Sequence, residues 1–145
     1  MNATPLRGPL TITLSRHLDA TPEAVYAAWT DADGYRRWFE AHRLILNPVV
    51  DGQWYVEALH EGRIWPHYGR FLRLERPRLV EHTWVSEATK GIESVLTIAL
   101  TPSEGGTDLK LTHAGLPDDE LGRQHEAGWK EILASFAEKI ARRAR

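Results

Sequence analysis

Turn signals divide the middle of the chain into short segments, and they limit its possible folds more than any other feature. Between residues 44 and 113, runs of alternating apolar and polar residues are separated by turn signals at Asp51-Gly52, Glu61-Gly62, Arg76-Pro77, Lys90-Gly91 and Gly105-Gly106. Strands joined by such short turns pair antiparallel, because a parallel pair needs a crossover of a dozen or more residues. The pattern therefore predicts an antiparallel meander of six strands.

The N-terminal part of the chain predicts one further strand and two short helices. Residues 10–15 alternate in the manner of a half-buried strand. Thr21-Pro22-Glu23 then supplies an N-cap, a proline in the first turn and an acid, which together start a helix. Residues 30–33 look like a break and a fresh cap, and a second short helix that carries Tyr35, Trp38 and Phe39 is expected after them.

A long amphipathic helix follows Pro117, where Asp118 and Asp119 are capping residues. Its inward positions recur at spacings of three and four, at Leu121, His125, Trp129, Ile132, Phe136 and Ile140. Gly128 lies beside this stripe. We interpret it as a point where the helix approaches the sheet closely.

These elements predict an α+β fold: a seven-stranded curved antiparallel sheet around the long C-terminal helix, with two short helices after the first strand. The sheet must curl around that helix, because the helix carries the one other large apolar surface that needs burial. No internal repeat, linker or shift in composition marks a boundary. We therefore expect a single domain over residues 1–145, with a core of about residues 10–140.

Composition and charge exclude several kinds of protein. The 145-residue chain has no Cys, which excludes disulfide frameworks, thiolate metal sites and thiol nucleophiles. Its net charge of −2 gives no general attraction to nucleic acid, and we interpret the basic residues Lys139, Arg142, Arg143 and Arg145 as the solvated end of the last helix. No apolar run is long enough to insert into a membrane, and residues 1–16 lack the layout of a secretory signal, so we expect a cytoplasmic protein.

Trp and His are abundant in this short chain, which has six Trp and seven His. Because side chains alternate between the two faces of a strand, the pattern predicts which residues face inward. Outward positions, Thr83 among them, are expected to be solvated. The inward positions on the strands and the long helix provide the ligand-binding candidates, which are Trp54, Val56, His60, Trp65, His67, Phe71, His82, Trp84, Ser94, Leu96, His113, His125 and Trp129.

An inner wall of this kind suggests a cavity rather than a solid core. Indole N–H groups and imidazole nitrogens need hydrogen-bond partners when they are buried. The wall is therefore expected to enclose some water or to be completed by a polar, aromatic ligand. The alternative is that each His bonds a neighbouring strand or loop.

The inward histidines are poor candidates for a metal site and better ones for proton transfer. Hairpin register places His82 beside Leu96 and Leu96 beside His113, so the two histidines lie about 10 Å apart at their backbones, too far for easy joint coordination. We therefore expect no metal and no cofactor. A contact between Ser94 and His82 lacks an acid to orient it. His67, His82 and His113 are the catalytic candidates, each as a general acid or base.

The chain also resembles a known family. The segments that carry the resemblance, in the family's order, are 20–31, 51–54, 69–71, 78–80, 106–109, 112–113 and 128–129. They are similar to bacterial relatives of the C-terminal domain of the activator of the heat-shock protein 90 ATPase, within the START-like (SRPBCC) superfamily of helix-grip folds. The family commonly has Gly-Gly where Asp51-Gly52 stands here. The resemblance implies a cavity between sheet and long helix and leaves its use open.

Three functions remain open from the sequence. The first is binding of a small, largely apolar molecule, aromatic or lipid-like, in that cavity. The second is a cyclase-, hydrolase- or isomerase-like enzyme that uses one of the inward histidines in the same cavity. The third, which the family name implies, is a chaperone-associated interaction module. We expect a monomer or a homodimer, with no nucleic-acid partner.

Overall fold

The structure, a computed structural model, describes residues 7–143 and contains the expected elements in the expected order. They are β1 (Leu10–Leu18), α1 (Pro22–Thr30), α2 (Ala32–Arg36), β2 (Ala41–Leu46), β3 (Gln53–His60), β4 (Arg63–Glu75), β5 (Leu79–Ser86), the 3-10 helix η1 (Glu87–Thr89), β6 (Ser94–Ser103), β7 (Gly106–Leu116) and α3 (Glu120–Arg143). The predicted α+β class is confirmed. Of the basic cluster at the C-terminus, Arg145 and the side chains of Arg142 and Arg143 lie outside the described residues.

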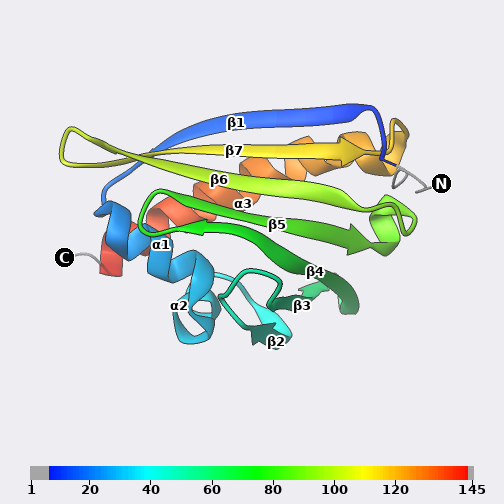
Figure 1. The fold of residues 1–145 in the computed structure, drawn as a ribbon, viewed down its shortest axis with the longest axis horizontal. Helices are drawn as coiled ribbons and strands as arrows, with labels where there is room; N and C mark the ends of the chain where they lie inside the picture. Colours follow the sequence, from blue (N-terminus) through cyan, green and yellow to red (C-terminus); the bar gives the residue numbers. More distant parts are fainter. Residues whose placement is uncertain (1–6, 144–145) are drawn as a thin grey trace.

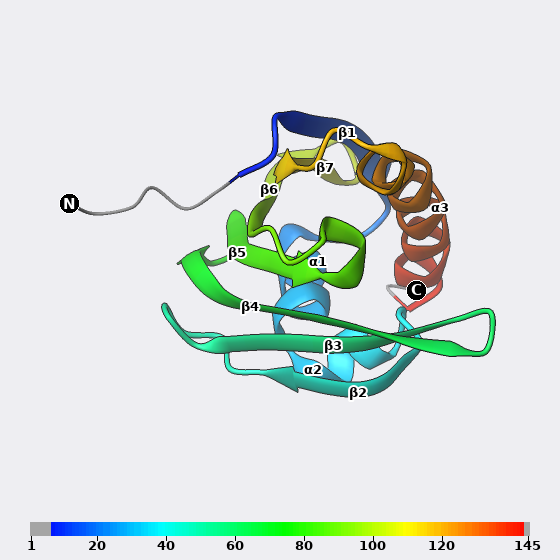
Figure 2. The same ribbon diagram turned by 90° about the vertical axis from the view of Figure 1, so that its right-hand side faces the viewer.

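The sheet is strongly curved, and α3 lies across its open side. Its strands follow the order β1-β7-β6-β5-β4-β3-β2, and each pairs antiparallel with its neighbour. Figure 1 shows α3 behind the sheet, and Figure 2 shows the sheet bent into a C around the helices. The edge strands β1 and β2 are joined through α1 and α2, so these two helices connect opposite edges of the sheet.

Capping side chains set the helix starts as the sequence predicts. Thr21 Oγ1 caps α1 by accepting a hydrogen bond from the Ala24 N–H at 3.1 Å. Asp31 both ends α1 and caps α2, where its carboxylate accepts a hydrogen bond from the Gly34 N–H at 3.3 Å. Asp119 caps α3 in the same way. Local chemistry therefore places the helices along the chain before any tertiary contact is considered.

The hairpin registers also match the sequence prediction. His82 pairs with Leu96, and Leu96 pairs with His113, so the two histidines lie two strands apart. Trp84 pairs with Ser94. The inner face of the sheet packs against α1 and α3 in a core whose large buried side chains include Trp29, Phe71, Ile98, Leu111 and Phe136.

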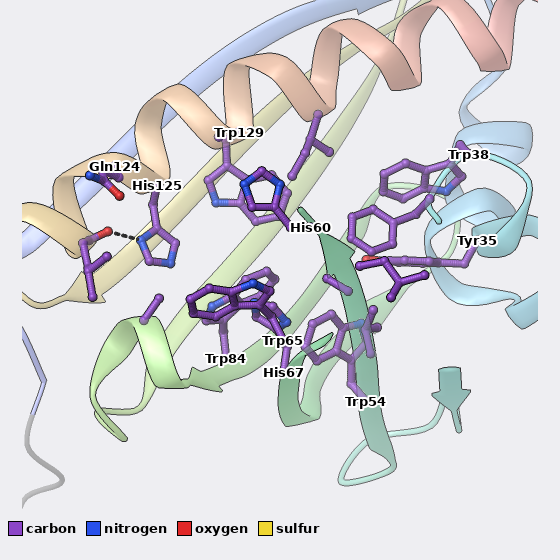
Figure 3. Close-up of a pocket in the computed structure, with 18 residues that line it drawn as sticks. Tyr35, Trp38, Trp54, His60, Trp65, His67, Trp84, Gln124, His125 and Trp129 are labelled. Atoms are coloured by element: carbon purple, nitrogen blue, oxygen red, sulfur yellow. Dashed lines mark hydrogen bonds between the residues drawn. The ribbon is translucent and has the colours of Figure 1, made fainter. Parts of the chain in front are cut away.

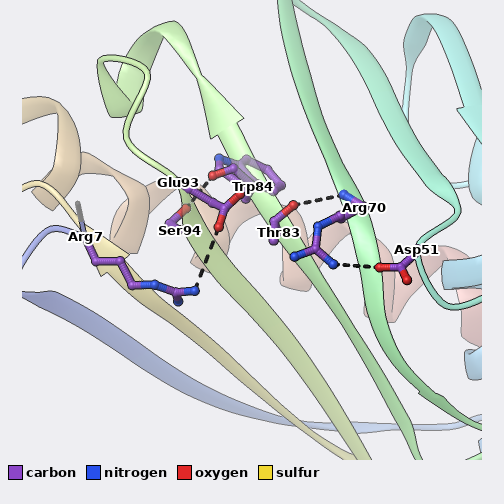
Figure 4. Close-up of polar contacts among 7 residues, drawn as sticks. All are labelled: Arg7, Asp51, Arg70, Thr83, Trp84, Glu93 and Ser94. Atoms are coloured by element: carbon purple, nitrogen blue, oxygen red, sulfur yellow. Dashed lines mark hydrogen bonds and ion pairs between the residues drawn. The ribbon is translucent and has the colours of Figure 1, made fainter. Parts of the chain in front are cut away.

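The predicted alternation of inward and outward side chains is wrong at Thr83, and His60, predicted to face inward, lies in an exposed position at the end of its strand. Thr83 is 2% exposed rather than solvated, because its Oγ1 accepts a hydrogen bond from the Arg70 N–H at 2.9 Å where the ladder between β4 and β5 is irregular. Figure 4 shows Thr83, Arg70 and Asp51 in a row, with the Arg70 guanidinium 2.8 Å from the Asp51 carboxylate. The His60 side chain is 70% exposed, because His60 ends β3 at the tip of a hairpin, paired with Arg63.

Gly69 is a point of close approach between β4 and β5, and it lies beside two stacked indoles of the inner face. It lies in β4 opposite Trp54 of β3, and the ring of Trp54 reaches the ring of Trp84 from β5, with centroids 5.2 Å apart and planes 30° apart. A Cβ at Gly69 would stand 1.9 Å from the Thr83 carbonyl oxygen, closer than any non-bonded contact allows. The absence of a side chain at Gly69 therefore allows β4 and β5 to approach each other this closely.

We expect Gly69→Ala to destabilise the protein by about 2 kcal/mol or more, because the added methyl group must displace backbone. The matched control is Gly128→Ala, where no atom lies within 4 Å of the added Cβ. Urea unfolding followed by tryptophan fluorescence measures both variants. Equal stabilities for the two variants would contradict the tight approach at Gly69.

Candidate functional site

A cavity of about 380 Å³ lies between the strands β3 to β5, the end of α2 and the N-terminal half of α3 (Figure 3). It is partly open to solvent, and its exposed lining residues include Leu59 and His60 at the end of β3 and Leu121 of α3. The residues that line it are Tyr35, Trp38, Phe39, Trp54, Val56, Ala58, Leu59, His60, Trp65, His67, Trp84, Ala88, Leu121, Gln124, His125, Gly128, Trp129 and Ile132.

Aromatic rings make up most of the cavity wall. The ring of Trp84 stands at its centre and contacts Trp54, Trp129 at 5.3 Å and His67 at 4.7 Å between centroids. Such offset and tilted arrangements are the favourable ones for aromatic pairs. The wall therefore consists of fixed ring faces and edges, against which a flat molecule could stack.

The structure separates the sequence-predicted site residues into two groups. Trp54, Val56, His60, Trp65, His67, Trp84, His125 and Trp129 line the cavity. The second group does not border it and lies in the packed interior: Phe71, His82, Ser94, Leu96 and His113. The alternation of side chains along the strands assigns both groups to the inner face of the sheet. However, α1 and the C-terminal half of α3 cover one part of that face and leave the other part open.

His113 belongs to a hydrogen-bond chain in which every proton has one position. The Trp129 indole N–H donates to His113 Nδ1 at 3.0 Å, so the imidazole proton is on Nε2. Nε2–H donates to Ser94 Oγ at 2.8 Å, and the Ser94 hydroxyl donates to the Trp84 carbonyl at 2.8 Å. Both nitrogens are used, and burial lowers the pKa of His113 well below its ordinary value. This histidine is structural, and Ser94 bonds it rather than His82.

His82 is also held in the interior. Its ring stacks on Trp54 with centroids 4.1 Å apart, and its Nδ1–H donates to the Thr83 carbonyl at 2.8 Å. Burial lowers the pKa of His82 from 6.5 to about 4, so the imidazole is neutral at pH 7. Of the three catalytic candidates, His67 is therefore the one at the cavity surface.

His67 and His125 are neutral imidazoles of the cavity wall. Burial lowers the pKa of His67 to about 4, with a smaller contribution from the nearby His125. Burial also lowers the pKa of His125, whose Nδ1–H donates to the Leu121 carbonyl at 2.9 Å. Its Nε2 is consequently an acceptor. Within residues 7–141 no group of three or more His, Cys, Asp or Glu side chains is arranged to hold a metal ion.

The indole donors are only partly satisfied. Trp129 donates to His113, and Trp38 donates to the Ala28 carbonyl at 2.8 Å. The N–H groups of Trp84 and Trp29 are buried without a partner among the side chains and backbone that the structure describes. The expectation that buried indoles find partners therefore holds for two of these four residues.

Sequence reasoning missed the end of the cavity that α2 forms. α2 ends at Arg36, so Trp38 and Phe39 lie in the turn after this helix and not, as the sequence predicted, on the helix itself. Tyr35 lies on α2 and points its hydroxyl end toward the cavity in Figure 3. The two-residue alternation that identified the inward residues applies to strands, so it could not identify these positions in α2 and the turn after it. The apolar stripe of α3 did contain a signal for Leu121 and Ile132, which the sequence placed on the inward face of the long helix.

Gly128 is not a point of close approach. It lies in the interior of α3 at the cavity surface, and no atom lies within 4 Å of the position a Cβ would take. The interpretation from sequence was wrong because a glycine on an inward helix face fits two opposite situations, a tight contact and an open space. The surrounding side chains show that it is an open space.

Comparison with known proteins identifies the family. The family model for Activator of Hsp90 ATPase homolog 1-like proteins matches residues 19–141. The chain belongs to this family. The match and the fold together confirm the helix-grip, START-like architecture that the sequence resemblance implied. No curated protein matches the chain.

Solved structures of bacterial proteins share the fold of this family member. A protein from Chromobacterium violaceum is 26% identical, with a TM-score of 0.79 over 92% of this chain and 99% of that one. CalU16 from Micromonospora echinospora is 26% identical, with a TM-score of 0.70 over 90% of this chain and 76% of that one. The Aha1 dimer from Colwellia psychrerythraea, 18% identical, has a TM-score of 0.71 over 91% and 98% of the two chains. Among residues 7–143, no helix is long and apolar enough to span a bilayer.

Burial of His82 predicts an acid-sensitive fold. Between pH 6.5 and 4 the unfolded chain binds a proton at His82 that the folded protein excludes, so the free energy of unfolding falls as the pH falls through this range. The full shift corresponds to about 3 kcal/mol. We expect His82→Phe, which keeps a ring beside Trp54, to lose less stability than wild type between pH 7 and 4 in urea titrations. An identical pH dependence of the two proteins would show that folding does not lower the pKa of His82.

Proposed function

We propose that this protein binds a small, largely apolar molecule, aromatic or lipid-like, in the cavity between the sheet and α3. The observation that carries the proposal is Gly128, which keeps the aromatic cavity open from within a long helix. The size of the space, about 380 Å³, and its mostly apolar lining are typical of small-molecule sites.

Gly128 is unfavourable for stability at its position. A glycine in a helix interior costs about 1 kcal/mol relative to alanine, since it loses more backbone freedom on folding. Nothing in the surroundings excludes a larger side chain at this position. A helix selected for stability alone would therefore carry alanine or leucine here, whereas a helix that borders a binding cavity benefits from the open space.

An enzyme in the same cavity is less well supported. His67 is the one catalytic candidate at its surface, and a pKa of about 4 makes this imidazole a weak base. The residues that line the cavity include no Asp, Glu, Lys or Arg to act with it. The described part of the chain thus favours binding over proton transfer. A chaperone-associated role rests on the family description alone.

Substitutions at Gly128 distinguish its effect on the open cavity from its effect on the stability of the helix. We expect Gly128→Ala to raise the free energy of unfolding by about 1 kcal/mol and to keep most of the cavity. Gly128→Leu extends its side chain into the space, so it should fold at least as well as wild type and bind apolar probes at least about tenfold more weakly.

Calorimetric titration of both variants and wild type with 2-naphthol, alongside urea unfolding, tests this expectation. The alanine variant is the matched control, because it changes the helix without filling the cavity. Unchanged affinity in a well-folded Gly128→Leu variant, or no binding of 2-naphthol by wild type, would contradict the proposed site.

A further inference from the structure

The cavity wall carries no formal charge at neutral pH. Its residues include no Lys, Arg, Asp or Glu among those that the structure describes. Its titratable members inside the opening are Tyr35, His67 and His125. Burial raises the pKa of Tyr35 and lowers the pKa of the two histidines, so all three side chains are neutral at pH 7. His60, at the rim, is largely exposed to solvent and has Glu61 3.8 Å from its ring.

Two cations near the opening are paired with carboxylates, and Lys139 Nζ donates to the carbonyl oxygen of the wall residue Trp38 at 3.3 Å. Arg63 lies over the ring of Trp65 at 3.9 Å and forms an ion pair with Glu87 of η1. Lys90, which follows η1, lies 2.9 Å from Asp119 at the start of α3. These pairs join β4, η1 and α3 beside the opening, so Arg63 and Lys90 already have carboxylate partners.

His125 offers a defined hydrogen-bond acceptor to a ligand in the cavity. His125 lines the cavity, and because its Nδ1–H donates to the Leu121 carbonyl, Nε2 carries a lone pair and no proton. Figure 3 shows the His125 ring on the cavity side of α3, across from Trp84. The rings of Trp84 and His125 are 6.4 Å apart at their centroids and nearly perpendicular, at 73°.

We propose that the cavity selects uncharged, flat aromatic molecules that carry a hydrogen-bond donor, of the phenol or indole kind, and rejects carboxylates, including fatty acids. This inference rests on the proposed binding function and narrows it. A carboxylate that enters the cavity loses its hydration and meets no cation, so its binding is opposed by desolvation. A neutral phenol or indole stacks on the indole wall and donates to His125 Nε2.

Three naphthalenes of similar size test the inference by calorimetric titration at pH 7.5. They are 2-naphthol, which is neutral and a donor, 2-methoxynaphthalene, which is neutral without a donor, and 2-naphthoate, an anion. We expect 2-naphthol to bind about fivefold more tightly than 2-methoxynaphthalene, the size of one hydrogen bond. It should bind more than about tenfold more tightly than 2-naphthoate.

Three variants at two positions assign the selectivity to residues. His125→Phe keeps a ring beside Trp84 but removes the acceptor, so 2-naphthol and 2-methoxynaphthalene should bind equally to it. Leu121→Lys places an ammonium group at the opening and should strengthen 2-naphthoate binding about fivefold, whereas Leu121→Met, of similar length, should not. Leu121 is 38% exposed, so both of its variants are expected to fold.

The outcomes distinguish this inference from the function on which it rests. If 2-naphthoate binds wild type as tightly as 2-naphthol, or if His125→Phe keeps the preference for 2-naphthol, the inference is overturned while binding in the cavity stands. If none of the three naphthalenes binds wild type, the proposed function fails and the inference fails with it.

Discussion

A hydrogen-bond chain from the Trp129 indole through His113 and Ser94 to the Trp84 carbonyl joins α3 to β7, β6 and β5. It fixes the distance between the helix and the centre of the sheet, because each donor in the chain has one acceptor. On one side of this link α3 packs into the core with Phe136 and Leu133. On the other side the helix and the sheet separate, and the cavity begins there.

The cavity stays open because several residues that border it have small side chains or none. Gly128 and the small side chains of Ala58 and Ala88 border the space, while aromatic rings and larger aliphatic side chains form most of the remaining wall. Leucines at the small positions would favour helix formation or burial more strongly. Retention of open space next to rigid rings is a property of binding sites, in which a preformed shape reduces the ordering that a ligand must cause.

Burial gives the histidines two different roles. His82 and His113 are enclosed by rings and backbone and contribute hydrogen bonds inside the fold. His67 and His125 lie at the cavity surface as neutral groups, and His125 presents an acceptor. The same cause, desolvation, keeps all four uncharged near neutral pH. The cavity wall consequently combines mostly apolar side chains with imidazoles that carry no charge near neutral pH.

The sequence by itself determined the order of the elements, the helix caps at Thr21, Asp31 and Asp119, and the pairing of Leu96 with His82 on one side and with His113 on the other. Each of these follows from local rules: turn residues, side-chain capping and the two-residue period of a strand. Only the tertiary structure decided which inward residues border open space. The alternation of side chains along a strand assigns each residue to a face but gives no information on depth, so the sequence could not distinguish the cavity residue His67 from the interior residue His113. In the same way, the helical spacing placed Gly128 near the inward face of α3 but could not distinguish an open space from a tight contact. The curvature of the sheet and the path of α3 across it make that separation.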